Sequence, residues 1–324
     1  MTMPTRERLV RMVELACRAP SVHNSQPWLW RIAGEATVEL YADRTRQLPI
    51  ADPEGRNLAI SCGAALQHAQ EVARALGMST RVDLTTSAPG HDLLARIQLG
   101  PARAPADAAE RLQAIEQRCT DRRRFTSWPV PEARLTKLAE AASGWGAYAI
   151  PVTDVTARFR AELLLERAMT VQAADPGLTA EQASWVAHSR VDGVPASNAA
   201  PATSERGGER PNRFSHENTD NRGSRALEGS DGLMAICTGH DDQSSWLRAG
   251  QALGDLWLHA ARDGLSIVPL SQVIEVPETR RGLHEDVFAG MAHPQLLLRV
   301  GWQEIARTTL PRTPRRQLED VLLT

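Results

Sequence analysis

The chain has 324 residues, of which 42% are apolar, and a formal net charge of −2 at pH 7. This length exceeds that of a usual single domain and predicts two core-forming units. The nearly balanced charge gives no reason to expect nucleic acid or a membrane surface as a partner. No segment has the roughly 20 consecutive apolar residues of a membrane span, and the first residues lack the apolar core of a signal peptide.

The cysteines and the single lysine narrow the chemistry. Cys17, Cys62, Cys119 and Cys237 are scattered and form no CxxC pair, which is typical of reduced thiols in a cytoplasmic protein. Lys137 is the only lysine and no Gly-Lys dipeptide exists, so the sequence excludes a P-loop. The histidines show no metal-ligand spacing, and we therefore expect no metal site.

The first predicted helix covers residues 6–17, where apolar residues recur at helical spacing. A loop follows over residues 18–28, and it concentrates short polar side chains within six residues: Ser21, His23, Asn24 and Gln26. Such a run is poorly suited to a helix or a strand, and it favours a fixed loop that hydrogen-bonds a planar polar ligand. A helix cap followed by an Asx turn is the alternative interpretation.

Three pairs of segments match one another in the same order and indicate a diverged duplication. The pairs are residues 6–17 with 134–142, residues 63–78 with 250–265, and residues 93–100 with 296–301. Gly77 and Gly264 stand where a glycine ends a helix, and a β-like run follows each, over 79–84 and 266–270. The predicted halves are residues 1–112 and 113–324.

Each half mixes several helices with a few short strands, which predicts an α+β fold rather than an alternating βαβ arrangement. The predicted helices over 63–76 and 250–263 are apolar on more than one face. We therefore expect them to be central and to pack against each other.

Arginines cluster over residues 118–124, just after a helical pattern that ends near residue 117. In an extended segment Arg118, Thr120 and Arg122 would share a face, because alternate residues do so. Two guanidinium groups around a hydroxyl suit a phosphate, although a solvated charged face is the ordinary meaning of such a run. A second basic pair, Arg315 and Arg316, precedes a final helix-like segment.

The longest segment without periodicity runs from residue 192 to residue 230 and is rich in Pro, Gly, Ser, Asn and Arg. A loop of this length in a compact domain is a lid, a binding loop or a disordered segment.

Several of these motifs resemble those of the FMN-dependent nitroreductase family. Residues 20–28 are similar to its Pro-Ser-x-x-Asn-x-Gln-Pro-Trp loop, residues 118–122 to its Arg-x-Ser-x-Arg/Lys phosphate motif, and residues 315–319 to its C-terminal Arg-x-Pro-Leu-Glu. Those proteins are dimers with FMN at the subunit interface. The resemblance implies a nitroreductase-like fold duplicated in one chain as an internal pseudo-dimer. The flavin loop survives only in the first half and the phosphate arginines only in the second, which implies one FMN per chain.

The resemblance is closer to the Acg-type branch, whose members are single-chain pseudo-dimers. It is carried by residues 52–56, 62–66, 120–123 and 294–302. Members of this branch bind FMN under a lid, which here would be the loop over about 192–230. The resemblance implies a monomer that contains the pseudo-dimer interface.

The resemblance also implies residue roles. The FMN phosphate would meet Arg118, Thr120 and Arg315, with Arg122 toward the phosphate or the ribityl chain and Arg316 as an alternate to Arg315. Ser21, His23, Asn24 and Gln26 would line the ribityl chain and the isoalloxazine edge. A backbone amide in the stretch around Leu270 and Ser271 would face flavin N5.

The activity implied is NAD(P)H-dependent reduction of a nitroaromatic or quinone-like acceptor by ping-pong hydride transfer, in which the flavin does the chemistry and no side chain is catalytic. The expected partner is a small-molecule electron acceptor. The alternative is a protein that binds and sequesters FMN under a closed lid with little or no turnover.

Overall fold

The computed structural model describes residues 5–85, 92–122, 125–186, 188–195, 227, 229–302 and 312–323. Most of the predicted loop over 192–230 lies outside the described residues. Within the described residues, no helix is long and apolar enough to cross a membrane.

The described residues of the first half form four strands and three α-helices. They are α1 (Arg6–Ala16), β1 (Trp28–Ile32), β2 (Thr37–Ala42), α2 (Arg56–Ala75), β3 (Met78–Leu84), β4 (Leu93–Pro101) and α3 (Ala108–Gln117). Two short 3-10 turns, Val22–Asn24 and Arg44–Arg46, lie in the connections around β1 and β2.

The second half repeats this order and adds helices to it. Its repeated elements are α4 (Glu132–Ala142), a 3-10 turn (Ser143–Trp145), β5 (Tyr148–Pro151), β6 (Gly232–Thr238), α7 (Gln243–Arg262), β7 (Leu265–Pro269) and β8 (His293–Trp302). The additions are α5 (Val155–Ala173) and α6 (Pro176–Ser184) after β5, and α8 (Gln272–Glu275), α9 (Pro277–Gly282) and a π-turn (Leu283–Val287) after β7.

The two sheets share one strand order, and this confirms the predicted duplication and the α+β class. The first sheet runs β3-β4-β2-β1-β9 and the second runs β5-β6-β8-β7, so β3, β4, β2 and β1 correspond to β7, β8, β6 and β5. The strand pairs within each set of four are antiparallel. As predicted, Gly77 and Gly264 end the central helices with φ angles of 75° and 74°.

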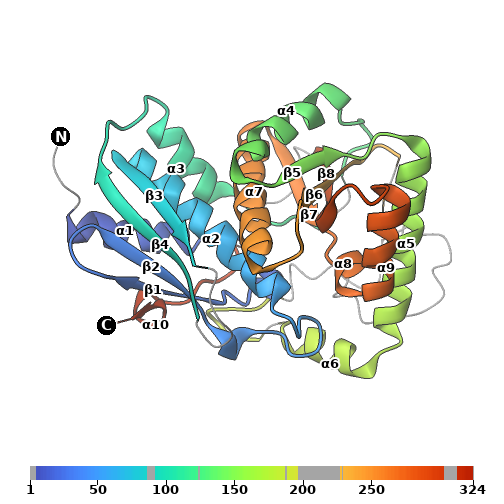
Figure 1. Cartoon of the computed structure of the whole chain (residues 1–324), viewed down its shortest axis with the longest axis horizontal. Coiled ribbons are helices and arrows are strands. Elements are labelled where there is room, and N and C mark those ends of the chain that lie inside the picture. The colour runs from blue at the N-terminus through green and yellow to red at the C-terminus, as the bar shows by residue number, and fades with distance from the viewer. Residues whose placement is uncertain are drawn as a thin grey trace.

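The central helices α2 and α7 pack against each other between the two sheets, as predicted (Figure 1). Their backbones meet at Gly63 and Gly250. A Cβ atom at Gly63 would overlap the carbonyl of Leu247, and one at Gly250 would overlap the carbonyl of Ile60. Glycine is therefore required at both positions, and the matched pair fixes the depth at which the halves pack.

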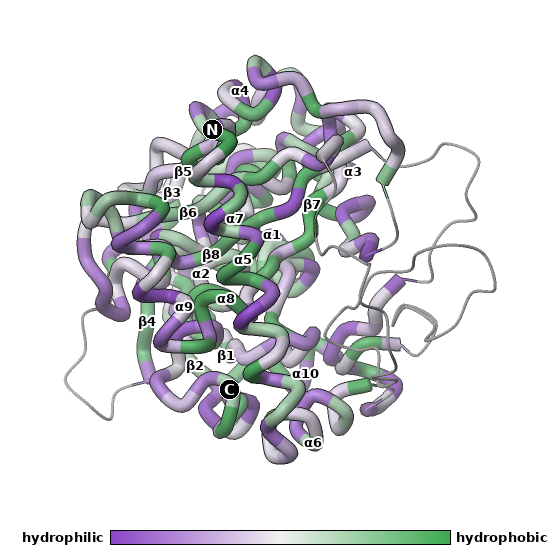
Figure 2. Tube along the Cα trace, turned by 90° about the vertical axis from the view of Figure 1, so that its right-hand side faces the viewer, coloured by the Kyte–Doolittle hydropathy of each residue, from purple (hydrophilic) through white to green (hydrophobic). Residues whose placement is uncertain are grey.

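The sheets differ in how they are covered. In β3 exposed residues alternate with residues that are buried or half-buried, whereas every residue of β6 is buried. Hydrophobic clusters line both faces of the second sheet, one with α4 and α7 and the other with α5 and α8. Figure 2 shows hydrophobic stretches gathered around α7, β8 and α8 in the middle of the molecule.

The C-terminal segment returns to the first half. Its short helix α10 (Leu318–Val321) leads into β9 (Leu322–Leu323), which pairs in parallel with β1 at the edge of the first sheet. Figure 1 shows this end of the chain beside β1. Arg315 and Arg316 are thereby carried to the loop that precedes β1.

Candidate functional site

The loop between α1 and β1 has an unusual backbone. His23, Asn24 and Gln26 all have positive φ angles, of 48°, 56° and 51°, which residues other than glycine rarely adopt. Two hydroxyl groups hold this shape: the amide of Gln26 donates to Ser21 Oγ at 3.0 Å, and the amide of Val22 donates to Ser61 Oγ at 3.1 Å. Such strain concentrates at functional sites, where the surrounding structure enforces it.

The Asn24 side chain connects the loop to two distant segments. Its Nδ2 donates to the carbonyls of Gly193 at 3.0 Å and Pro314 at 3.1 Å. Asn24 Oδ1, the atom that would close an Asx turn, accepts from Arg315 Nη1 at 3.1 Å, so the alternative of a local Asx turn is wrong at this residue.

Gln26 also connects the loop to these two distant segments, and it is fully buried. Its Nε2 donates to the carbonyl of Val191 at 2.9 Å, and its Oε1 accepts from the amide of Arg316 at 2.9 Å. Asn24 and Gln26 together join residues 191–193 and 314–316 to the loop.

Arg118 is the least compensated cation of this region. Its side chain is buried, since the residue is only 8% exposed, and its guanidinium lies over the ring of Trp257 at 4.7 Å. Nη2 donates to the carbonyl of Arg18 at 3.3 Å, whereas Nε and Nη1 have no hydrogen-bond partner among the described residues. Burial lowers the pKa of Arg118 to about 10. A buried guanidinium with two unused donors is suited to an anion.

Arg315 lies next to Arg118 and meets the C-terminal end of α1. Its Nε donates to the carbonyl of Cys17 at 2.9 Å, and its Nη1 donates to Asn24 Oδ1 at 3.1 Å. Burial and the neighbouring charge of Arg118 lower the pKa of Arg315 to about 9. A cation at a helix C-terminus is favourable, so Arg315 both caps α1 and adds positive charge to the site.

His68 completes the cluster from α2. The residue is fully buried, and burial together with the charges of Arg118 and Arg315 lowers its pKa to about 3. His68 is therefore neutral at pH 7. Its Nε2 has no hydrogen-bond partner among the described residues. Arg118, Arg315 and His68 are called the cation cluster below.

Arg316 differs from Arg315 because an acidic residue compensates it. Its Nη1 lies 3.1 Å from Asp43 Oδ2, where Asp43 is buried and Arg316 is half-buried. Arg46 likewise pairs with Asp192 and also donates to the carbonyl of Ser25. These two ion pairs fix the segments that flank the loop, and Arg315 is the better candidate for an anion.

The remaining predicted residues are placed less directly. Thr120 and Arg122 follow α3 in irregular backbone and are half-buried, and their role at a phosphate stays a prediction.

The prediction for Leu270 is wrong: its amide donates to the carbonyl of Leu297 at 2.8 Å, so it is not the donor expected toward flavin N5. Ser271 is buried at the start of α8. In the next residue Gln272 Oε1 is buried and has no partner among the described residues.

Ser61, His68 and Trp257 were not predicted as site residues. Ser61 and His68 are seven residues apart and so lie on one face of α2. Two polar residues at this spacing in an almost entirely buried helix are a signal for a site. Trp257 gave no such signal, since an indole in α7 is equally suited to the core. Among the described residues, no group of three or more His, Cys, Asp or Glu could hold a metal ion.

These features define a duplicated α+β protein with a buried cation cluster beside a strained loop. Among curated proteins, the chain is similar to two from Mycobacterium tuberculosis H37Rv. It is 34% identical over 322 residues to "Putative NAD(P)H nitroreductase Rv3131", which covers 98% of this chain and 92% of the relative. It is 31% identical over 333 residues to "Putative NAD(P)H nitroreductase acg", which covers 99% and 96%. The chain belongs to this nitroreductase family, in its Acg-type branch, as the motifs predicted.

No family model matches the chain. Among solved structures, a nitroreductase with bound FMN from Bacteroides fragilis aligns with 63% of this chain and 94% of its own length, at 14% identity and a TM-score of 0.41. A nitroreductase-like protein from Bacillus cereus aligns with 62% and 90%, at 13% identity and a TM-score of 0.34. At these TM-scores the structural resemblance is weak, and the family assignment rests on the sequence relatives.

Proposed function

We propose that this protein is an FMN-dependent oxidoreductase that holds one FMN per chain and uses NAD(P)H to reduce a nitroaromatic or quinone-like acceptor. The observation that carries the proposal is Arg118, a buried guanidinium with two unused donors, next to a second cation and without an acidic partner among the described residues. A phosphate monoester would supply the missing negative charge. The named activities of the M. tuberculosis relatives support the choice of flavin chemistry.

Different residues would contact different parts of the FMN molecule. Arg118 and Arg315 would bind the phosphate, with Thr120 and Arg122 beside it. The strained loop would line the ribityl chain and ring edge through Ser21, His23, Asn24 and Gln26. Ser271, at the start of α8, is the candidate for a contact with the isoalloxazine ring.

The chain itself would bind and shield the cofactor rather than supply a nucleophile or a general acid. Bound FMN would supply the hydride-transfer chemistry, by accepting a hydride from NAD(P)H and passing electrons to the acceptor. The neutral state of His68 removes a third charge from the cation cluster, so that one phosphate balances Arg118 and Arg315. The burial of these groups strengthens each contact with the phosphate.

The test is the visible spectrum of the purified, FMN-loaded protein before and after addition of NADH or NADPH without oxygen. Bleaching of the flavin absorbance, followed by its return with nitrofurazone or a quinone, would support the oxidoreductase. Released flavin and protein mass should give one FMN per chain. Two FMN per chain would contradict the assignment of a single site.

One observation favours a second function, in which the protein sequesters FMN with little turnover. Residues 191–193 sit on the strained loop through Asn24 and Gln26, and Asp192 is tied to Arg46. In this arrangement the start of the predicted lid covers the flavin loop.

The variant Arg46→Ala separates the two functions, because it removes the ion pair with Asp192. If the covering segment limits turnover, this variant should bind FMN and be reduced by NAD(P)H faster than the unmodified protein. Arg44→Ala is the matched control, because Arg44 lies two residues away and pairs with Asp92 at the surface. Rapid turnover by the unmodified protein would exclude sequestration.

A further inference from the structure

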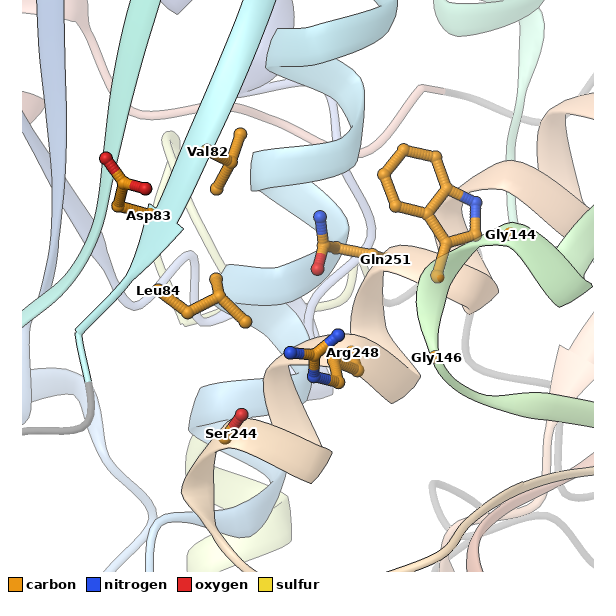
Figure 3. A pocket seen from close by; sticks show the side chains of 9 residues that line it. Val82, Asp83, Leu84, Gly144, Gly146, Ser244, Arg248 and Gln251 are labelled. Atoms are coloured by element: carbon orange, nitrogen blue, oxygen red, sulfur yellow. The ribbon is translucent and has the colours of Figure 1, made fainter.

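A cavity lies between β3, α7 and the segment after α4, and no residue of the strained loop is among those that line it. It measures about 420 Å³. Residues from β3, from the segment after α4 and from α7 line it: Val82, Asp83, Leu84, Gly144, Trp145, Gly146, Ser244, Arg248 and Gln251. Figure 3 shows Arg248 and Gln251 on α7 reaching toward the space beside β3.

The duplication relates this cavity to the proposed flavin site. Residues 143–146 follow α4 as the strained loop follows α1. In the registration of Gly63 with Gly250, Arg248 stands where Ser61 stands, and residues 82–84 stand where residues 269–271 stand. The contact is repeated as well: Ser61 bonds the loop after α1, and Arg248 packs against Gly146. The cavity is therefore the symmetric counterpart of the proposed flavin site, and we call it the twin cavity.

The twin cavity offers polar groups that lack partners. Gln251 is only 5% exposed and lines the cavity, and its side-chain amide makes no hydrogen bond with the described part of the chain. The guanidinium of Arg248 forms no ion pair within the same part. A buried amide and an adjacent free cation in one cavity indicate a ligand with a hydrogen-bonding, negatively charged end.

The walls of the cavity are flat or apolar. The indole N–H of Trp145 donates to Asp255 at 2.7 Å, which fixes the ring plane. The side chains of Val82 and Leu84 face the cavity from β3, whereas the carboxylate of Asp83 lies on the opposite face of the strand, 3.8 Å from Arg81 (Figure 3). The acidic residue on the lining is thus directed away from the ligand space.

We propose that the twin cavity binds a small planar aromatic carboxylate. The carboxylate pairs with Arg248, the Gln251 amide donates to it or to a ring substituent, and the ring lies between Trp145 and the apolar side of β3. Arg248 is the single arginine on the lining, in contrast to the two arginines of the cation cluster, so the cavity suits a monoanion rather than a flavin phosphate.

The test is isothermal titration of the full chain with 2-naphthoate and, separately, with its neutral counterpart 2-naphthamide. The FMN-loaded protein should bind one naphthoate per chain. Arg248→Gln should weaken naphthoate about tenfold or more and leave naphthamide nearly unchanged, since only the charge-assisted contact is lost. Gln251→Leu should weaken naphthoate as well. Arg81→Gln, on the outer face of β3, should change neither probe.

Three results would overturn the proposal: no heat of binding from folded protein, equal effects of Arg248→Gln on both probes, or displacement of naphthoate by added FMN. Circular dichroism verifies that each variant is folded. The titration is repeated without FMN, so that the outcome does not depend on the proposed function. If the chain fails to bind FMN but still binds naphthoate through Arg248, the flavin proposal fails and this one stands.

Discussion

Replacing Arg118 with methionine should lower the affinity for FMN while leaving the free protein almost as stable as before. Methionine keeps the length and much of the packing against Trp257 but removes the charge. The loss of a charge-assisted phosphate contact costs about 1.5–3 kcal/mol, or roughly ten- to hundredfold in affinity. Riboflavin lacks the phosphate, so its affinity should change little.

The effect on stability follows from the same burial. Burial lowers the pKa of Arg118 from its ordinary value to about 10, which corresponds to about 3 kcal/mol of desolvation cost for the charged form. This cost is fully present at pH 7, because the lowered pKa still lies well above 7. Loss of the contact with Trp257 and of the hydrogen bond to Arg18 offsets about 2–3 kcal/mol of it. The free energy of unfolding without FMN should therefore change by no more than about 1 kcal/mol.

Arg56→Met is the matched control. Arg56 is also buried, but its Nη2 lies 2.8 Å from Asp241 Oδ2, and it also bonds Gln295. Removing it leaves Asp241 without its cationic partner and the buried Gln295 Oε1 without a donor, and should destabilise the protein by about 1–3 kcal/mol. Urea denaturation without FMN measures both effects, and fluorescence titration measures both flavins. A large loss of stability in Arg118→Met, or equal losses of FMN and riboflavin affinity, would refute the reasoning.

Three further predictions concern the scaffold. Gly250→Ala places a methyl group against the Ile60 carbonyl and should lower the midpoint of thermal unfolding by several degrees or more, whereas Gly239→Ala, with open space around it, should not. Burial raises the pKa of Asp52 to about 6, so between about pH 4 and 6 the folded state binds a proton that the unfolded state does not, and the free energy of unfolding should fall as the pH rises through this window. In Asp52→Asn, urea denaturation should show a fall that is smaller by about 2–3 kcal/mol. An unchanged pH dependence in this variant would contradict the assignment. Asn24→Ala removes the bonds to residues 193 and 314 and should speed proteolytic cleavage after residue 190, and unchanged cleavage would count against that role.

The sequence alone was enough to predict the class and the duplication. Both depend on local patterns: helical spacing, glycines at the ends of two helices, and strands that follow them. The glycine pair at 63 and 250 was visible as a match between segments, and the structure gives it a physical reason, since neither backbone can approach the other with a side chain in between. The family followed from short motifs because their residues are adjacent in the chain.

The tertiary structure alone decided which polar groups meet. Arg118, Arg315 and His68 come from three distant parts of the sequence, and the return of the C-terminal segment to β1 brings Arg315 to the other two. Apart from the Arg315 guanidinium, the long-range partners of Asn24 and Gln26 are backbone carbonyls and an amide, which no residue type at those positions reveals. The packing also decided what each buried charge costs, because an arginine side chain is costly to bury where no acid compensates it and less so where an acid such as Asp43 does. Local patterns depend only on residues that are close in the sequence, whereas desolvation and long-range pairing depend on how the whole chain packs.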